Sequence, residues 1–149
     1  MQKIVNGMHK IVKCNKEDYT TLSAIWERSV RATHDFLNED TITEIKAALE
    51  PSYFPNVELY AMSHNGSLTG FIGLRNDMIE MLFIDSHSRR QGYGSSLIEF
   101  ALDRGVTKVD VNEQNPRALA FYQAKGFKII GRDANDDAGR PYPILHLSL

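Results

Sequence analysis

The sequence predicts an α/β fold in which helices flank a mixed central sheet, and three observations indicate this class. Apolar residues recur with a helical period between residues 16 and 49, and strand-like runs dominate from residue 57 to residue 84. Asn65-Gly66 separates two of these runs, which is a strong signal for a β-hairpin. A glycine-containing loop and the Asn115-Pro116 pair each precede a helical segment. The predicted element order is β-αα-βββ-α-β-α-ββ.

The first part of the chain predicts one strand and two helices. His9 to Cys14 has the pattern of a strand, and Asn15 is suited to cap a helix whose first turn is acidic. The apolar stripe of this helix is Tyr19, Leu22, Ile25, Trp26 and Val30. Three- and four-residue spacing places that stripe on one face, against a core. The helix frays near His34, and a second helix from Glu39 to Leu49 is ended by Pro51.

The rest of the chain predicts a hairpin followed by alternating strands and helices. The expected strands are Val57 to His64, Leu68 to Leu74, Met78 to Ile84, Thr107 to Val111, Lys128 to Gly131 and Pro143 to Leu147. Helices are expected from about Gly94 to Arg104 and from Asn115-Pro116 onward, and a turn-rich stretch from Arg132 to Arg140 joins the last two strands. Glu80 is the one ionisable residue in the otherwise apolar run from Met78 to Ile84.

Composition limits the classes of function. With 149 residues and no linker-like tract, we expect a single domain over residues 1–149. A formal net charge of −2 provides no broad basic field for nucleic acid or an anionic membrane. The single cysteine, Cys14, cannot form an internal disulfide, and no segment resembles a signal peptide or a spanning helix. We therefore expect a cytoplasmic protein that binds neither nucleic acid nor a membrane.

The loop after the Met78 to Ile84 strand carries the pattern R-x-x-G-x-G in the run Arg89-Arg90-Gln91-Gly92-Tyr93-Gly94. Glycines let the backbone approach a ligand closely, and the following helix N-terminus is partly positive, so the loop is suited to a diphosphate. The alternative is a polar turn in which the glycines only permit a tight connection. A Walker loop is excluded because Gly-Lys-Ser/Thr is absent, and a dinucleotide fingerprint is excluded by Leu97.

Three segments in combination resemble the GNAT acetyltransferase superfamily: the loop, the strand Lys108 to Asn112 and the segment Asn115 to Phe127. Arg89, Gly92 and Gly94 fall on that family's Q/R-x-x-G-x-G/A pyrophosphate motif. The resemblance implies a mostly antiparallel sheet of about seven strands, flanked by about four helices and splayed between the fourth and fifth strands. It also implies transfer of an acetyl group from acetyl-CoA to a primary amine of a small molecule or peptide, by direct attack in a ternary complex.

The same resemblance implies a set of cofactor contacts. The pantetheine pairs like an extra strand with backbone in the fourth strand, and the pyrophosphate lies on the glycine loop. The implied residues are Leu82, Phe83, Ile84, Arg89, Arg90, Gln91, Gly92, Tyr93, Gly94, Ser95, Asn115, Tyr122 and Lys125. Some have structural alternatives: Asn115 is also a good helix cap, Tyr122 a possible core aromatic, and Lys125 a possible surface residue. No metal is expected.

Acetyl transfer to an amine needs a proton donor for the departing thiolate, a proton acceptor for the amine and donors for the developing oxyanion. Tyr122 is the candidate acid because of its family-matched position. Glu80 is the candidate base acting through water, unless it lies on a solvated face of the sheet. His34 is the rival base, unless the helix dipole alone accounts for it. Backbone N–H groups near Leu82 or Phe83 can stabilise the oxyanion.

Other classes of function find less support in the residues. The five histidines show no metal-ligand spacing, and no G-x-S-x-G elbow indicates a serine hydrolase. A catalytically idle acyl-CoA-binding sensor or interaction module remains the alternative, because a cofactor motif indicates binding more directly than turnover. A cationic acceptor is suggested by Asp35, Glu39, Asp136 and Asp137. The sequence leaves open the acyl chain, the acceptor and whether the protein is a monomer or a homodimer.

Overall fold

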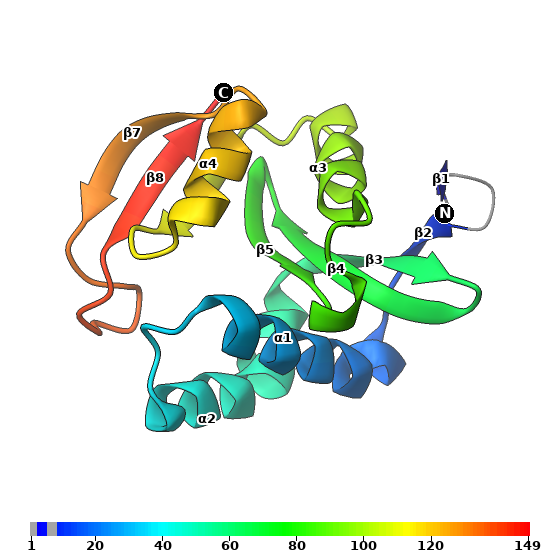
Figure 1. Cartoon of the computed structure of the whole chain (residues 1–149), viewed down its shortest axis with the longest axis horizontal. Helices are drawn as coiled ribbons and strands as arrows, with labels where there is room; N and C mark the ends of the chain where they lie inside the picture. Colours follow the sequence, from blue (N-terminus) through cyan, green and yellow to red (C-terminus); the bar gives the residue numbers. More distant parts are fainter. Residues whose placement is uncertain (1–2, 6–8) are drawn as a thin grey trace.

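The computed structural model describes residues 3–5 and 9–149, with side chains from residue 9 onward. Its centre is a sheet with strand order β1-β2-β3-β4-β5-β6-β8-β7 (Figure 1). The strands are β1 Lys3–Val5, β2 His9–Lys13, β3 Glu58–His64, β4 Ser67–Arg75, β5 Met78–Ile84, β6 Lys108–Asn112, β7 Lys128–Asp133 and β8 Ile144–Ser148. The helices are α1 Tyr19–Thr33, α2 Glu39–Ala48, α3 Tyr93–Asp103 and α4 Pro116–Ala124.

The mixed, mostly antiparallel α/β fold expected from the sequence is confirmed. The β5–β6 pair is parallel, and each other neighbouring pair in the described sheet is antiparallel. All seven expected strands form. The eighth, β1, pairs with β2 at the edge of the sheet and was not expected. A run of three residues is too short to show the alternation by which a strand is recognised in a sequence.

The beginning of the first helix follows the predicted chemistry. The Asn15 side chain accepts a hydrogen bond from the Glu17 N–H at 3.0 Å, and Asp18 accepts one from the Asn15 N–H at 2.9 Å. These bonds close a capping box over a 3₁₀ turn that leads into α1. The second helix, α2, ends at Ala48, one residue earlier than expected. Pro51 lies in the π-helical turn that follows it.

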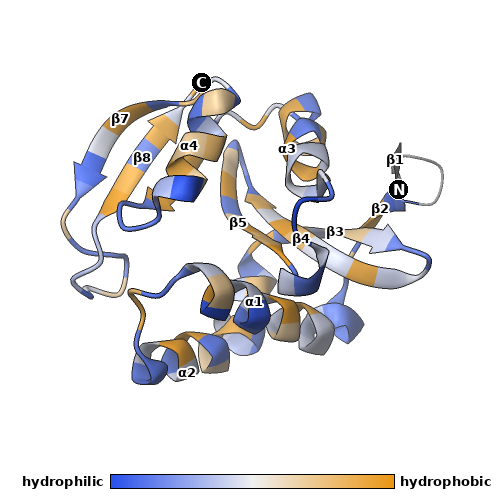
Figure 2. Cartoon of the chain, viewed as in Figure 1, coloured by the Kyte–Doolittle hydropathy of each residue, from blue (hydrophilic) through white to orange (hydrophobic). Residues whose placement is uncertain are grey.

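The central strands are buried on both faces and separate two hydrophobic cores. Phe71 and Ile72 are consecutive on β4 and fully buried, yet they belong to different cores. One core lies between the sheet and α3 and α4, and the other between the sheet and α1 and α2. Apolar residues accordingly run along the sheet and the facing sides of the helices (Figure 2). This explains the continuous apolar runs in the sequence, because a strand buried on both faces loses the alternation of polar residues.

The sheet is divided where β5 meets β6. These two strands pair only through Met78↔Lys108 and Ile79↔Val109 at their beginnings. Beyond these pairs the strands separate, and the remaining backbone of β5 that faces β6 has no ladder partner there. The splay predicted between the fourth and fifth strands is therefore present, since these are β5 and β6. Among the described residues, no helix is both long and apolar enough to cross a membrane.

Candidate active site

A first pocket lies at the splay, on the side of α3 and α4, and has a volume of about 400 Å³. Its lining comes from α1, β5, the glycine loop, α3 and α4. The lining residues are Ser29, Thr33, His34, Leu82, Phe83, Ile84, Ser88, Arg89, Arg90, Gly92, Tyr93, Gly94, Ser95, Asn115, Arg117, Ala118, Phe121 and Tyr122. Eleven of the thirteen residues expected to contact the cofactor are in this set. Gln91 and Lys125 are not, and the Lys125 ammonium lies 5.7 Å from the centre of the Phe121 ring.

The glycine loop leaves the N-terminus of α3 open to this pocket. Arg90 has φ 65° and Gly92 has φ 79°, so two residues of the loop adopt left-handed backbone. Gly92 is the N-cap of α3 and provides no side-chain cap, whereas the asparagines before α2 and α4 both accept bonds from first-turn N–H groups. First-turn N–H groups of a helix without such a cap are available to an anion. The loop therefore fits a diphosphate.

An ion pair between an exposed arginine and a buried aspartate holds the segment that leads into the loop. Arg28 on α1 donates two hydrogen bonds to Asp85, at 2.9 and 2.7 Å. These bonds hold the pKa of Asp85 below its usual value, and only 7% of the Asp85 surface is exposed. Sequence reasoning missed this pair, because its members are 57 positions apart and no local pattern joins them. It ties the end of β5 to α1, which also lines the pocket.

A β-bulge aims Glu80 away from this first pocket. In the β4–β5 ladder Gly73 pairs with Met81 and Leu74 pairs with Ile79, so Glu80 is an extra residue on β5. A bulge interrupts the alternation of side chains along a strand. As a result Glu80 and Met81 both line the second pocket although they are neighbours in sequence. Glu80 therefore lines a pocket. The sequence had left open whether it faces a cleft or lies on a solvated face of the sheet.

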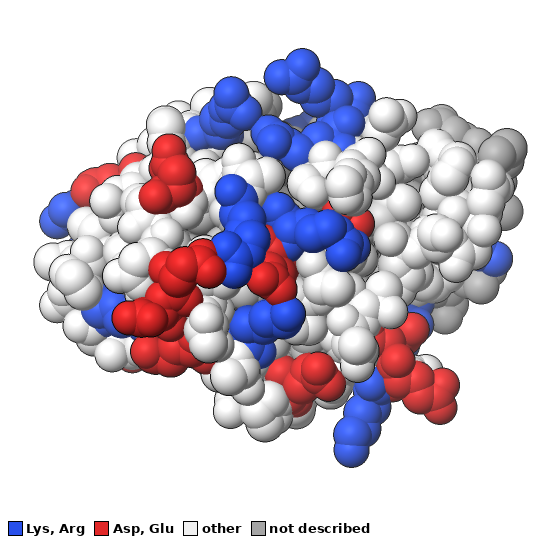
Figure 3. Space-filling view, turned by 60° about the horizontal axis from the view of Figure 1, so that its bottom comes forward, with Lys and Arg blue, Asp and Glu red and all other residues white. Residues whose placement is uncertain are grey.

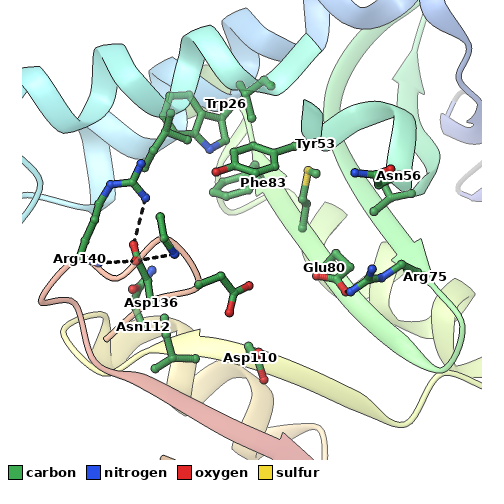
Figure 4. Close-up of a pocket in the computed structure, with 17 residues that line it drawn as sticks. Trp26, Tyr53, Asn56, Arg75, Glu80, Phe83, Asp110, Asn112, Asp136 and Arg140 are labelled. Carbon is green, nitrogen blue, oxygen red and sulfur yellow. Dashed lines mark hydrogen bonds and ion pairs between the residues drawn. The ribbon is translucent and has the colours of Figure 1, made fainter. Parts of the chain in front are cut away.

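The second pocket has a volume of about 390 Å³ and lies on the other side of the splay (Figure 4). Its lining residues are Trp26, Ile45, Leu49, Tyr53, Asn56, Val57, Arg75, Glu80, Met81, Phe83, Asp110, Asn112, Asp136, Asp137, Ala138, Arg140 and Ile144. Phe83 is the residue that lines both pockets, so they meet at its ring. Four carboxylates and two guanidinium groups contribute to this lining, which gives the second pocket an acidic balance.

Ion pairs organise the charges of the second pocket. Arg75 contacts Glu80 at 2.9 Å, and Arg140 contacts Asp136 at 3.1 Å and also Glu44 on α2. With α1 and α2 turned forward, acidic and basic side chains lie intermixed on this face of the molecule (Figure 3). The charge around this pocket is therefore arranged in local pairs rather than as one broad field of a single sign. Asp35 and Glu39, which suggested a cationic acceptor, are not among the lining residues.

Tyr122 lies in the first pocket with 7% of its surface exposed. Its ring packs edge-on against Phe121 and Phe127, at centroid distances of 5.3 and 5.7 Å. Burial raises the pKa of its hydroxyl above the ordinary value, so the group keeps its proton at neutral pH. Within residues 9–149, no hydrogen bond engages this hydroxyl. The Tyr122 side chain thus packs as a core aromatic and also lines the pocket. The sequence offered these two positions as alternatives, and the structure combines them.

His34 bridges α1 and α4 across the first pocket. Thr33 Oγ1 donates to the Ser29 carbonyl at 2.8 Å, so it accepts at 2.7 Å from His34 Nδ1. Asn115 Oδ1 accepts from the Ala118 N–H at 3.3 Å, which turns the Asn115 NH₂ group toward His34 Nε2 at 3.4 Å. Both contacts select the neutral imidazole with its proton on Nδ1. Burial agrees with them, because it lowers the pKa of His34 to about 4.

Comparison with known proteins identifies the family. Residues 18–141 match the acetyltransferase (GNAT) domain family. The chain belongs to the GNAT acetyltransferases. It is 41% identical over 143 residues to the peptidyl-lysine N-acetyltransferase YjaB of Salmonella typhimurium, covering 94% of this chain and 97% of that one. The apo-form solution structure of Escherichia coli YjaB superimposes with a TM-score of 0.85 and 39% identity, covering 94% of this chain and 96% of that one.

A more distant structure shares only the fold. The PaiA N-acetyltransferase of Thermoplasma acidophilum, solved in complex with coenzyme A, has a TM-score of 0.70 and 18% identity, covering 95% of this chain and 99% of that one. Membership of the GNAT family confirms the predicted enzyme class, an N-acetyltransferase that uses acetyl-CoA. Among the residues that the structure describes, no three His, Cys, Asp or Glu side chains are grouped to hold a metal ion.

The glycine loop gives the first prediction. Gly92 and Gly105 have φ 79° and 85°, and a Cβ on either meets no atom within 4 Å. Gly92→Ala and Gly105→Ala should therefore each lose about 1 kcal/mol of unfolding free energy through backbone strain. Only Gly92 lines the first pocket, where the sequence predicts that CoA binds, so only Gly92→Ala should weaken CoA binding, roughly tenfold or more. Calorimetric titration with CoA measures this, and equal affinities in the two variants would argue against a pyrophosphate site at the loop.

His34 gives a prediction about acid stability. Its folded pKa of about 4 lies below the ordinary 6.5, so between these values the unfolded chain binds a proton that the folded chain does not. Stability should fall as the pH drops through that window, by an amount on the order of 2–3 kcal/mol. Urea unfolding of His34→Gln between pH 7 and pH 4 should show a flatter dependence. The control His87→Gln, at an exposed histidine, should keep the parent's slope, and a parent-like slope in His34→Gln would contradict this account.

Proposed function

We propose that this protein transfers the acetyl group of acetyl-CoA directly to the side-chain amine of a peptide-bound lysine, with both substrates bound at once. The observation that carries the proposal is the pair of pockets on opposite sides of the splay, which meet at Phe83. One pocket has the donors for a diphosphate, and the other has an acidic balance suited to an alkylammonium group. The names of the two YjaB relatives support lysine as the acceptor, since both are called peptidyl-lysine N-acetyltransferases.

The shape of the second pocket supports a long aliphatic amine. Trp26, Tyr53 and Phe83 form an aromatic wall near the meeting point of the pockets (Figure 4). The methylene stem of lysine can pack against such a wall while its ammonium group remains near carboxylates. Glu80 lies along the same strand as Phe83, on the same face of the sheet. An extended lysine side chain could thus lie along this face, with its amine between Glu80 and Phe83.

The residues can be given separate roles in the transfer. The bound acetyl-CoA supplies an activated acetyl thioester. Glu80 accepts the proton of the acceptor ammonium through water, and N–H groups of β5 near Leu82 or Phe83 stabilise negative charge on the acetyl oxygen. Tyr122, neutral and buried, donates its proton to the leaving sulfur. His34 is a positioning residue rather than the base, for two reasons. It lines the first pocket, whereas Glu80 lines the second, and the Asn115 side chain occupies the lone pair of its Nε2.

Glu80→Gln tests the base. Acetylation of a lysine peptide should slow by roughly 100-fold or more at neutral pH, with the larger loss at lower pH because the amine is harder to deprotonate there. The pH–rate profile measures this, and CoA binding should be unchanged. Glu113→Gln is the matched control: Glu113 also pairs with an arginine, Arg132, but lines neither pocket. A Glu80→Gln profile that overlays the parent's would remove Glu80 from this role.

Tyr122→Phe tests the acid, because it removes the hydroxyl and keeps the ring packing. The chemical step should slow by about 100-fold to 10,000-fold in single-turnover measurements, while the CoA dissociation constant changes less than about threefold. Tyr60→Phe is the control, since Tyr60 is 4% exposed in the same core and lies outside both pockets. An undiminished chemical step in folded Tyr122→Phe would end the assignment.

The same assays separate an enzyme from an idle acyl-CoA-binding module. An enzyme releases the free thiol of CoA when acetyl-CoA and an acceptor are both present. Intact CoA binding without thiol release, across a panel of lysine peptides and small amines, would instead support the binding module.

A further inference from the structure

Asp110 and Glu80 lie at the point where β5 and β6 begin to separate. Ile79 pairs with Val109 in the last registered pair of the parallel ladder, and Glu80 and Asp110 are the next residues on the two strands. Both side chains line the second pocket, on strands at either side of it (Figure 4). Because the strands diverge from this point, an elongated group could lie between the two carboxylates.

Each carboxylate is held by a cationic or protonatable partner through one of its two oxygens. Both contacts from Arg75 go to Glu80 Oε1, at 3.1 and 2.9 Å. His146 Nδ1 lies 2.7 Å from Asp110 Oδ1. The other oxygens, Glu80 Oε2 and Asp110 Oδ2, have no hydrogen bond within the described part of the chain. The side chains are 22% and 34% exposed, so they are partly desolvated but remain accessible from the pocket.

We propose that Asp110 binds the acceptor ammonium together with Glu80 and thereby selects a cationic amine. This inference rests on the proposed lysine acetylation and adds a second acceptor-binding residue to it. An ammonium group has three donors, so the free oxygens of Asp110 and Glu80 can both accept from it, that of Glu80 through the water that relays its proton. Partial burial strengthens the attraction relative to an exposed ion pair. A neutral or anionic acceptor would gain nothing from this pair of carboxylates.

His146 holds Asp110 in this orientation. Its other nitrogen, Nε2, lies 2.6 Å from Asp133 Oδ2, so the imidazole sits between two aspartates. Hydrogen bonds to Asp110 and Asp133 raise the pKa of His146, which favours the form that donates to both. Asp133 does not line either pocket. The two aspartates therefore share a partner but differ in access to the acceptor, and this difference provides a matched control.

The alternative role for Asp110 is structural. Asp110 and His146 are directly opposed in the β6–β8 ladder, so their bond could simply stabilise strand pairing. A structural role predicts that Asp110→Asn and Asp133→Asn behave alike, because each weakens one bond to His146. An acceptor-binding role predicts that they differ in the KM of the acceptor.

Steady-state kinetics with a lysine peptide of fixed sequence decide between these roles. Asp110→Asn should raise the acceptor KM roughly tenfold or more and leave the KM of acetyl-CoA unchanged, whereas Asp133→Asn should leave both unchanged. Asp110→Glu, which keeps the charge, should recover part of the lost affinity. CoA titration shows that each variant is folded.

The outcomes also separate this inference from the proposed function. If the parent acetylates the peptide and the two Asn variants share one acceptor KM, the Asp110 assignment is overturned while lysine acetylation stands. If the parent acetylates no lysine peptide, the proposed function fails, and the Asp110 assignment fails with it.

Discussion

The structure depends on the early separation of β5 from β6. Two residue pairs join these strands, and beyond them both strands have backbone groups without a ladder partner. Unpaired backbone polar groups are costly when buried, so such a gap persists only where water or a ligand can satisfy them. A pantetheine chain could provide these bonds as an added strand does. The gap also lets the two pockets on opposite sides of the sheet meet at Phe83.

Local chemistry made the residues of the first pocket, the proposed cofactor site, predictable from the sequence. The glycine loop, the first turn of α3 and the Asn115 cap are each encoded by a few neighbouring residues, and their effects on the backbone are local. The chain from the end of β5 to Tyr122 is one continuous stretch of strand, loop, helix, strand and helix. Once the family resemblance gives the order of these elements, the side chains that meet in the pocket follow.

The second pocket, the proposed acceptor site, could not be predicted in the same way, because its residues come from distant parts of the chain. Tyr53 follows α2, Asp110 lies on β6, and Arg140 belongs to the connection between β7 and β8. No glycine in β5 marks the bulge at Glu80 in the sequence. If β5 had no bulge, the alternation of side chains would place Glu80 and Met81 on opposite faces of the sheet. Sequence reasoning also treated Glu80 and His34 as rival candidates for one base, whereas the structure places them in different pockets.

The central claim is that both substrates occupy the two pockets at the same time, and initial rates measured with both substrates varied test it most directly. The account predicts double-reciprocal lines that intersect, because acetyl-CoA and the lysine peptide must both be bound before transfer. Parallel lines would mean that CoA departs before the peptide binds. That result would contradict direct transfer where the pockets meet at Phe83.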